Sequence, residues 1–581
     1  MSFEQSSDDL LGEVIQDRLV LQDYCPIAES LEWQLGQTVY WKTRGRNAFL
    51  CDDVPFAINS DGRLSNHAAQ LLFESLRTSE KEGTLAEGRI YALEIGVGLG
   101  LFARLFLDAF RDLCHANRVS YYDRLCYLAA DRSETMLEDI GRHGLLANHS
   151  GHYETIVVDA TRLDLKEFLR DGTLCAAFLN YLLDTLPFTV LSVDQDEVRQ
   201  LCARTCIGRS CNLSEHTALD FETITRLARS DDPGQQSELL HLHDVFSVDY
   251  VYLPTDPNCI PYAGFALRCI NPGQQHVLHN YGAIRCLESL LDAIDGEGFV
   301  LISDYALDLE KNPGDRLVES FQHQRFGGST AIGVNDSLLE SWVEKAQGCR
   351  WAKPPEDSEH ICTRLIGKQS MRDETIDCFV QQFDKSKFQW LQEPVERARN
   401  LFKEGRRESA LAEFREALRR QPYNWAIMGE VAEFLTQALQ SHSAGLALSS
   451  RAIELNPISP ELWNTQGDAL FYLGRMEEAH NAFLRALECD AEDARTHLNL
   501  VYSYVRKNDL AGALREVANG LYFDRTGEFR DRLIERQNEI LQRLNHQQHR
   551  RREFALNRLN WTATQFLSDG HEKRNSPDEH P

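Results

Sequence analysis

The chain has 581 residues, 43% of them hydrophobic, which is enough for two or three domains with sizeable cores. Its formal net charge of −28 repels phosphate backbones and anionic lipids, which argues against direct binding to nucleic acid or membranes. No apolar run reaches the roughly 18 to 20 residues of a membrane-spanning helix, and the acidic start "MSFEQSSDDLLGEV" is unlike a secretion or organelle-import signal. We therefore expect a cytoplasmic protein.

Short apolar runs alternate with helical patterns over much of the first two thirds of the chain. Residues 1–75 are less regular and end in a helix, "NHAAQLLFESLR", for which Ser65 is the expected N-cap. The runs that follow are "IYALEIG", "LCYLAAD", "TIVVDA", "CAAFLNYLLD" and "FVLISDYALD". This alternation is typical of a parallel sheet with helices on both faces. It predicts a Rossmann-like, doubly wound α/β domain over residues 76–375, with an insertion at about 190–275.

Three glycines at alternate positions, Gly96, Gly98 and Gly100, follow the first predicted strand. Two ordinary explanations are a dinucleotide-binding turn for NAD and a tight turn that only packs. The dinucleotide fingerprint, however, spaces its glycines G-x-G-x-x-G, whereas this chain has G-x-G-x-G with Glu94 two residues ahead. The combination resembles motif I of the class I S-adenosylmethionine-dependent methyltransferases.

That resemblance implies a cofactor site at the ends of successive strands. Asp131 ends the second predicted strand, where the family accepts hydrogen bonds from the ribose hydroxyls, and Asp159 ends the third, where the family reads the adenine amino group. A single carboxylate at a strand end is usually a cap or a solvated turn residue, but several in register favour a site. The residues expected to bind S-adenosylmethionine are Glu94, Gly96, Gly98, Gly100, Asp131 and Asp159.

The segment "FLNYLLDTLPF", residues 178–188, is similar to the N-E-x-x-D-A-L-P element of the MidA family, which includes the mitochondrial complex I assembly arginine methyltransferase. The resemblance covers roughly residues 56–366. Tyr181 stands where that family has glutamate, and a guanidinium is best held by a carboxylate fork, so the departure weakens the expectation of arginine as acceptor. The candidate catalytic residues are Asp184 as orienting base, Tyr181 as a hydrogen-bonding residue and Asn180 as a shaping residue. A polar strand end leading into the turn at Pro187 explains them equally well.

The fifteen cysteines are scattered, which is typical of reduced thiols in a large chain of this kind. Cys202, Cys206 and Cys211 have the spacing C-x3-C-x4-C, which lacks the paired cysteines of a zinc site. We expect no metal.

An internal repeat fills the last third of the chain. The stretch "PELWNTQGDALFYLGRMEEAHNAFLRALECDAED" matches the tetratricopeptide (TPR) pattern, and residues from Gly405 to Pro422 repeat it in phase. About four repeats run from near Gln389 to near Arg525, and "EFRDRLIERQNEILQRL" follows as a capping helix. The predicted boundaries are a linker at 376–388, repeats and cap at 389–545, and a partly disordered tail at 546–581.

The expected whole is a methyltransferase domain joined to a TPR solenoid that recruits a protein substrate or partner in its groove. Two alternatives stay open. One is a scaffold that binds S-adenosylmethionine without turnover. The other is a small-molecule methyltransferase in which the insertion covers the acceptor and the repeats only form oligomers. The sequence leaves the methyl acceptor, the partner and the oligomeric state undecided.

Overall fold

The structure, a computed structural model, divides the chain into two compact units, Met1–Asn424 and Trp425–Pro581. The predicted disordered tail lies almost wholly outside the described residues. The structure describes residues 18–45, 47–50, 62–194, 197–208, 211, 213–230, 232–270, 276–306, 325–326, 328–355, 361–524 and 526–549.

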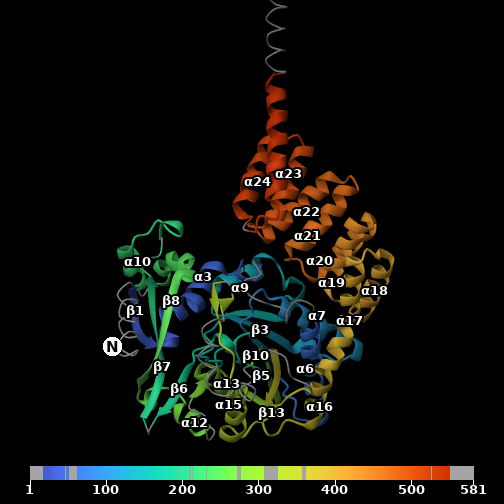
Figure 1. The fold of residues 1–581 in the computed structure, drawn as a ribbon. Helices are drawn as coiled ribbons and strands as arrows, with labels where there is room; N and C mark the ends of the chain where they lie inside the picture. The colour runs from blue at the N-terminus through green and yellow to red at the C-terminus, as the bar shows by residue number, and fades with distance from the viewer. Residues whose placement is uncertain are drawn as a thin grey trace, which may run out of the picture. The chain divides into compact units, whose positions relative to one another are not determined.

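A seven-stranded sheet forms the centre of the first unit, in the order β13-β14-β10-β5-β2-β3-β4 (Figure 1). Neighbouring strands from β10 to β4 are parallel, whereas β14 runs antiparallel to both β10 and β13. Each of the five apolar runs predicted as strands lies on one of the five parallel strands. The strands are β2 (Arg89–Ile95), β3 (Leu125–Asp131), β4 (Tyr153–Val157), β5 (Gly172–Asn180), β10 (Ile294–Tyr305), β13 (Arg350–Ala352) and β14 (Ile361–Gly367).

Helices cover both faces of this sheet, which explains why the central strands β2 and β3 are buried along nearly their whole length. On one face, Phe106 of α7 (Leu101–Asn117) packs on Tyr127 and Phe178, with ring centroids 5.3 and 5.0 Å apart. On the other face, α13 (Tyr281–Ala293) buries Leu287 and Leu291 in one cluster with the strands.

Helix α6 (Arg63–Lys81) packs on α7. It begins at Arg63 after Gly62, which has a φ of 74°, and Ser65 is buried inside the helix. The expectation of Ser65 as N-cap was therefore wrong.

A second, antiparallel sheet is built on β7 (Glu197–Gly208), which pairs with β8 (Phe246–Pro254), β6 (Thr189–Asp194) and β1 (Arg18–Pro26), while β9 (His276–His279) pairs with β6. The predicted insertion thus supplies most of this sheet. Strand β1 comes from the N-terminal segment predicted to be irregular or helical, which is a correction to that prediction. No local pattern predicts this strand, because β1 pairs with a strand about 180 residues further along the chain.

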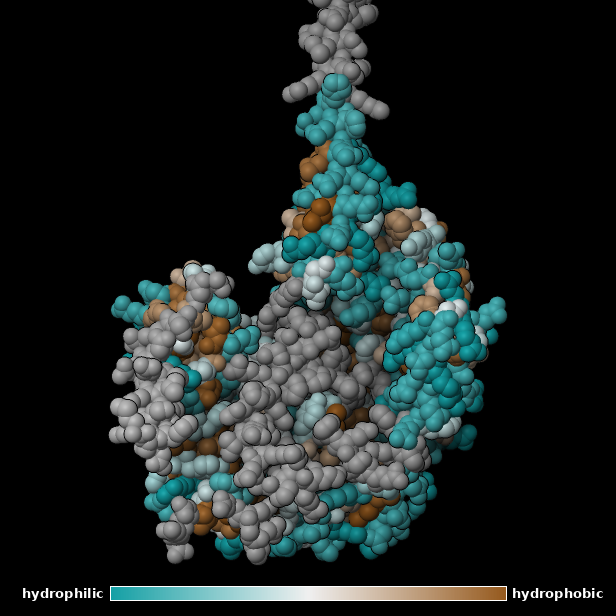
Figure 2. All heavy atoms as spheres, in the orientation of Figure 1, coloured by the Kyte–Doolittle hydropathy of each residue, from teal (hydrophilic) through white to brown (hydrophobic). Residues whose placement is uncertain are grey.

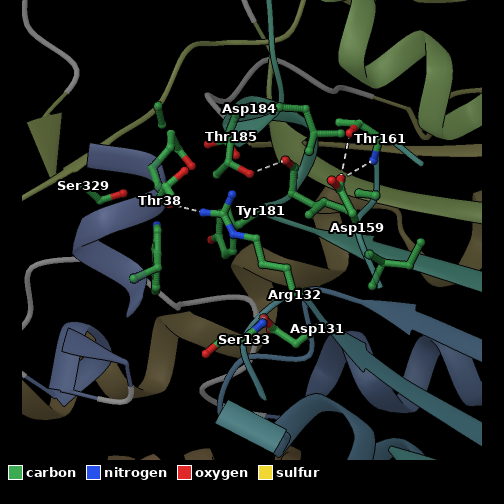
Figure 3. A pocket seen from close by; sticks show the side chains of 18 of the residues that line it. Thr38, Asp131, Arg132, Ser133, Asp159, Thr161, Tyr181, Asp184, Thr185 and Ser329 are labelled. Atoms are coloured by element: carbon green, nitrogen blue, oxygen red, sulfur yellow. Dashed lines mark hydrogen bonds between the residues drawn. The ribbon is translucent and has the colours of Figure 1, made fainter. Parts of the chain in front are cut away.

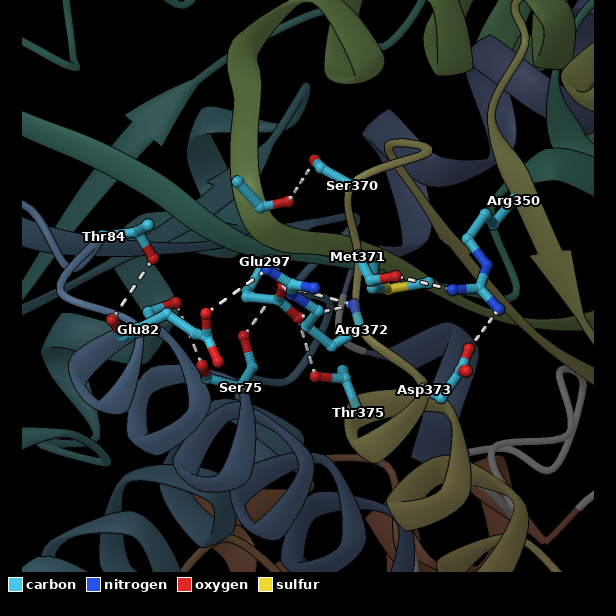
Figure 4. Close-up of polar contacts among 12 residues, drawn as sticks. Ser75, Glu82, Thr84, Glu297, Arg350, Ser370, Met371, Arg372, Asp373 and Thr375 are labelled. Carbon is cyan, nitrogen blue, oxygen red and sulfur yellow. Dashed lines mark hydrogen bonds and ion pairs between the residues drawn. The ribbon is translucent and has the colours of Figure 1, made fainter.

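Buried Glu297 on β10 connects the main sheet to two helices (Figure 4). Its carboxylate accepts hydrogen bonds from the Arg372 amide at 3.0 Å and the Thr375 hydroxyl at 3.0 Å, at the start of α16 (Asp373–Gln382). Ser75 of α6 donates to the Glu297 carbonyl at 2.9 Å. The predicted linker at 376–388 is therefore largely helical, because it contains the end of α16 and the start of α17 (Lys385–Lys403).

Helical hairpins follow, as the repeat pattern predicted. Helices α17 and α18 (Arg407–Arg420) end the first unit, and their visible surface is mostly hydrophilic (Figure 2). The turn residues Gly405, Gln440, Gly474 and Asn508 all have positive φ, from 53° to 78°, so one turn geometry recurs four times. The second unit contains α19 (Trp425–Glu433), extended by Phe434–Ala438, then α20 (His442–Leu455), α21 (Pro460–Tyr472), α22 (Met476–Cys489), α23 (Ala494–Arg506), α24 (Leu510–Phe523) and a helix over 530–549.

The last helix buries Leu533 and Ile540 against the preceding hairpin, as expected of a capping helix. Within the hairpin α21–α22, Gly467 lies against the ring of Phe483, and a Cβ added at this glycine would be 2.3 Å from a ring carbon. This close approach of two helices depends on a residue without a side chain.

We expect Gly467→Ala to lower the free energy of unfolding of the second unit by about 1–3 kcal/mol, because the Phe483 ring must move out of a packed position. Urea unfolding of the full chain, with the transition of the second unit analysed separately, measures this free energy. Glu488→Ala on the exposed side of α22 is the control and should be neutral. Equal stability of Gly467→Ala and wild type would contradict the packing argument.

Candidate functional site

A cavity of about 520 Å³ lies at the carboxyl ends of the parallel strands (Figure 3). Strand β2 lies between β3 and β5. The connection from β2 leads to β3 on one side, whereas the next strand of this sheet after β5 is β10, on the opposite side, so the connections diverge between β2 and β5. In open α/β sheets, ligands bind at such a switch point, outside the carboxyl ends of the strands. The size of the cavity suits a cofactor-sized molecule.

The glycine turn after β2 forms one wall of the cavity through Gly96 and Gly98. Gly96, Gly98 and Gly100 have φ values of 77°, 52° and 77°, a region that side chains disfavour. A Cβ added at Gly98 would lie 3.1 Å from the ring of Phe49. The turn therefore uses glycine both for its backbone shape and for space on the cavity side.

Asp131 lines the cavity at the end of β3 and holds the glycine turn in place. Its carboxylate accepts hydrogen bonds from the Ser133 amide at 2.9 Å and the Gly98 amide at 3.3 Å. Burial raises the pKa of Asp131, and these amide hydrogen bonds oppose the rise. Each carboxylate oxygen has a second lone pair, so Asp131 can still accept from a ligand hydroxyl.

Asp159 lines the same cavity beyond the end of β4. Its Oδ1 accepts two hydrogen bonds from Thr161, from the amide at 2.8 Å and from the hydroxyl at 2.7 Å. These bonds fix the orientation of the carboxylate, and the side chain remains exposed to solvent.

The three predicted catalytic residues, Asn180, Tyr181 and Asp184, also line the cavity, at and just after the end of β5. Tyr181 has a φ of 50°, and its ring packs on Tyr305 with centroids 5.4 Å apart. Asn180 Oδ1 and Asp184 Oδ1 are buried and accept no hydrogen bond from the described part of the chain. Buried oxygens that lack a donor are suited to a ligand that brings one.

Asp184 is paired with a second buried carboxyl, Asp304, and each is only 3% exposed. Asp304 accepts three backbone hydrogen bonds, from the amides of Leu182, Leu183 and Tyr305 at 2.7–3.0 Å. Burial raises the pKa of Asp304 to about 7, and burial together with the Asp304 charge raises that of Asp184 well above its ordinary value. Both carboxyls therefore hold a proton to a higher pH than an exposed aspartate does, and they titrate as a coupled pair.

Two residues expected to bind the cofactor do not line the cavity. Glu94 is fully buried under the sheet edge, where the Tyr127 hydroxyl donates to it at 2.8 Å, and burial raises its pKa to about 8. Gly100 is the N-cap of α7 and faces Ile140, 3.0 Å from where its Cβ would be. Both residues thus support the glycine turn from behind.

Other parts of the cavity wall were not predicted. The N-terminal segment contributes Trp33, Gln37, Trp41 and Phe49, and the segment before α15 (Asp336–Ser341) contributes Ser329. Gln236 reaches the cavity from the insertion. Only Arg132 carried a signal in the sequence, because it directly follows Asp131 at a strand end.

No group of three or more His, Cys, Asp or Glu side chains in the described ranges could hold a metal ion. Cys202 and Cys206 are buried on β7. Among the described helices, none is both long and apolar enough to cross a bilayer.

Comparison with known proteins bears on the helical hairpins. The tetratricopeptide repeat family model matches residues 395–460 and 464–528. These residues are tetratricopeptide repeats. Repeats of this family typically bind protein partners. The chain is also 36% identical over 77 residues to the TPR repeat-containing thioredoxin TTL4 of Arabidopsis thaliana, a match that covers 13% of the chain and 11% of that relative.

Solved structures similar to the TPR repeats include a thermophilic TPR protein of Thermus thermophilus, with 20% identity, a TM-score of 0.24 and coverage of 26% of this chain and 82% of that one. The first TPR domain of Spaghetti (RPAP3), solved with a bound HSP90 peptide, is 20% identical with a TM-score of 0.20. This match covers 20% of this chain and 93% of that one. The match to an uncharacterized protein of Burkholderia thailandensis covers 60% of this chain and 77% of that protein, with 16% identity and a TM-score of 0.35.

We expect the stability of the wild-type protein to fall as the pH rises from 5.5 to 8, in part because of Glu94. Its folded-state pKa of about 8 exceeds the unfolded value of 4.5, so between these limits only the folded state holds the proton. Glu94→Gln removes this titration. Its free energy of unfolding, relative to wild type, should rise by about 3 kcal/mol over this range.

Urea unfolding at both pH values measures the effect. Glu288→Gln, which removes a less buried carboxyl that also accepts from a tyrosine, is the control. A Glu94→Gln variant with the same pH dependence as wild type would show that Glu94 is ionised in the folded protein.

Proposed function

We propose that the first unit is an S-adenosylmethionine-dependent methyltransferase and that the TPR repeats bring it a protein substrate. The observation that carries this proposal is the convergence on one cavity of the glycine turn, Asp131 and Asp159 on one side and Asn180, Tyr181 and Asp184 on the other. A cofactor half and an acceptor half are what a transfer reaction needs.

The charge of the cavity favours this cofactor over a dinucleotide. Asp131 and Asp159 line its cofactor half, and Arg132 is the basic residue among the lining residues. A pyrophosphate would add two negative charges to this acidic surface, whereas a sulfonium and an ammonium group would be attracted to it. The free lone pairs of Asp131 also fit the cofactor, because they can accept from its ribose hydroxyls.

The cofactor would supply an electrophilic methyl group on its sulfonium. The protein's part is to hold the acceptor in line and to take up the proton that the acceptor loses. The Asp184–Asp304 pair can do this, because a proton arriving at Asp184 can be balanced by transfer of the Asp184 proton to Asp304. Trp33 and Trp41 from the N-terminal segment also line the cavity, and their rings would keep bulk water from the acceptor half.

A protein substrate is favoured by the repeats, since this family typically binds protein partners. In the acceptor half, a substrate guanidinium would meet one carboxyl group, that of Asp184, beside the aromatic pair Tyr181–Tyr305. Among the residues that line the cavity, this half therefore lacks the second carboxylate of a fork.

Asp131→Ala should reduce S-adenosylmethionine affinity at least tenfold, because it removes the ribose acceptor and releases the Gly98 amide. Isothermal titration of wild type and variant with S-adenosylmethionine, and in parallel with NAD, measures this. Asp112→Ala, at an exposed position on α7, is the control and should bind as wild type does. Wild-type binding to NAD alone, or to neither compound, would overturn the proposed function.

Asp184→Asn should leave cofactor affinity within about twofold and lower methyl transfer to proteins captured on the repeats at least tenfold. Transfer from labelled S-adenosylmethionine measures the rate. Equal rates would remove Asp184 from the mechanism. Cofactor binding without transfer by the wild type would identify a non-catalytic scaffold, and transfer only to small molecules would identify the other alternative.

A further inference from the structure

The side chain of Arg132 occupies the middle of the cavity, between the positions that would contact the cofactor (Figure 3). The surrounding protein lowers the pKa of its guanidinium, while the charges of Asp131 and Asp159 raise it. Arg132 thus lies within the field of both carboxylates to which the proposed function assigns the ribose and the adenine amino group. A planar base held by those two carboxylates would lie beside the guanidinium.

The far end of Arg132 binds the N-terminal part of the chain. Its Nη2 donates to the Gln37 carbonyl, in the segment over residues 31–44 that forms α2 (Leu31–Gln34), a π-helical turn (Leu35–Val39) and α3 (Tyr40–Arg44). We name residues 31–44 the cap segment. The cap segment lines the cavity through Trp33, Gln37, Thr38 and Trp41. The hydrogen bond from Arg132 to Gln37 therefore joins the strand-end side of the cavity to the cap segment that covers it.

The cap segment is closely packed on its other side. A Cβ at Gly36 would lie 2.3 Å from Thr330 Oγ1, and the Gln37 side chain donates to the Thr330 carbonyl. Phe49, just beyond the segment, lies over Gly98. The cover therefore extends from the glycine turn to the carboxylates at the strand ends.

A guanidinium can contact a planar base and a backbone carbonyl at the same time. Its flat face stacks on aromatic rings, while its N–H groups donate hydrogen bonds within the guanidinium plane. Lysine keeps the charge and can donate to a carbonyl, but it has no flat face. This difference separates stacking from charge in an experiment.

We propose that Arg132 stacks on the adenine of the bound cofactor while its edge holds the cap segment through Gln37, so that cofactor binding and seating of the cap are coupled. This rests on the proposed function. Because the coupling is reciprocal, whatever loosens the cap weakens cofactor binding, and the cofactor in turn protects the cap.

The test combines titration with hydrogen–deuterium exchange of the peptide over residues 31–44, on the full chain with and without S-adenosylmethionine. In wild type, the cofactor should slow exchange of this peptide. Arg132→Met should speed its exchange without cofactor, lower affinity at least tenfold and abolish the cofactor's protection. Arg132→Lys should retain slower exchange than Arg132→Met without cofactor, yet bind at least fivefold more weakly than wild type.

Arg142→Met is the matched control, since Arg142 lies on α9 (Glu134–Arg142) with a side chain 62% exposed, outside the cavity lining. It should behave as wild type in both measurements. Wild-type affinity and exchange in Arg132→Met would overturn the inference and leave the proposed function standing. Absence of cofactor binding by wild type would overturn the proposed function and the stacking together, while exchange of the unliganded proteins would still decide whether Arg132 holds the cap.

Discussion

The parallel pairing of β2 with both β3 and β5 is the constraint on which the site depends. Parallel strands end at the same edge, so residues from Gly96 to Asp184, up to 88 positions apart along the chain, are brought into one cavity. The glycine turn and the polar residues that follow each strand need no further device to meet. Burial of both faces by α7 and α13 fixes this edge and makes its geometry rigid.

Ionisable groups near this edge are held in protonation states that water would not give them. Glu94 and the Asp184–Asp304 pair all have raised pKa values, mainly because burial disfavours their charged forms. Glu94 keeps its carboxyl behind the glycine turn, where it supports structure. The pair reaches the cavity through Asp184, where the proposed transfer would take place. Similar burial therefore supports the glycine turn at Glu94 and suits the pair to its proposed role in proton uptake.

The repeats are stabilised in a different way from the sheet domain. A single hairpin such as α21–α22 cannot bury its apolar face, so stability comes from stacking and from close approach at small residues such as Gly467. Their period could be read from the sequence because it places small and aromatic residues at fixed intervals. The four turns with positive φ at 405, 440, 474 and 508 follow the same period, even where the glycine is replaced by Gln440 or Asn508.

Local sequence patterns were enough to predict several features of this protein. The five parallel strands, the glycine turn, the repeats and seven of the nine candidate site residues at the cavity could be predicted, because each depends on a short pattern or on the end of a strand. Tertiary structure alone decided that β1 joins the second sheet, that the cap segment covers the cavity and that Glu94 lies behind the turn. These features depend on contacts between residues far apart in the chain, whose energies come from packing and burial and leave no local pattern to read.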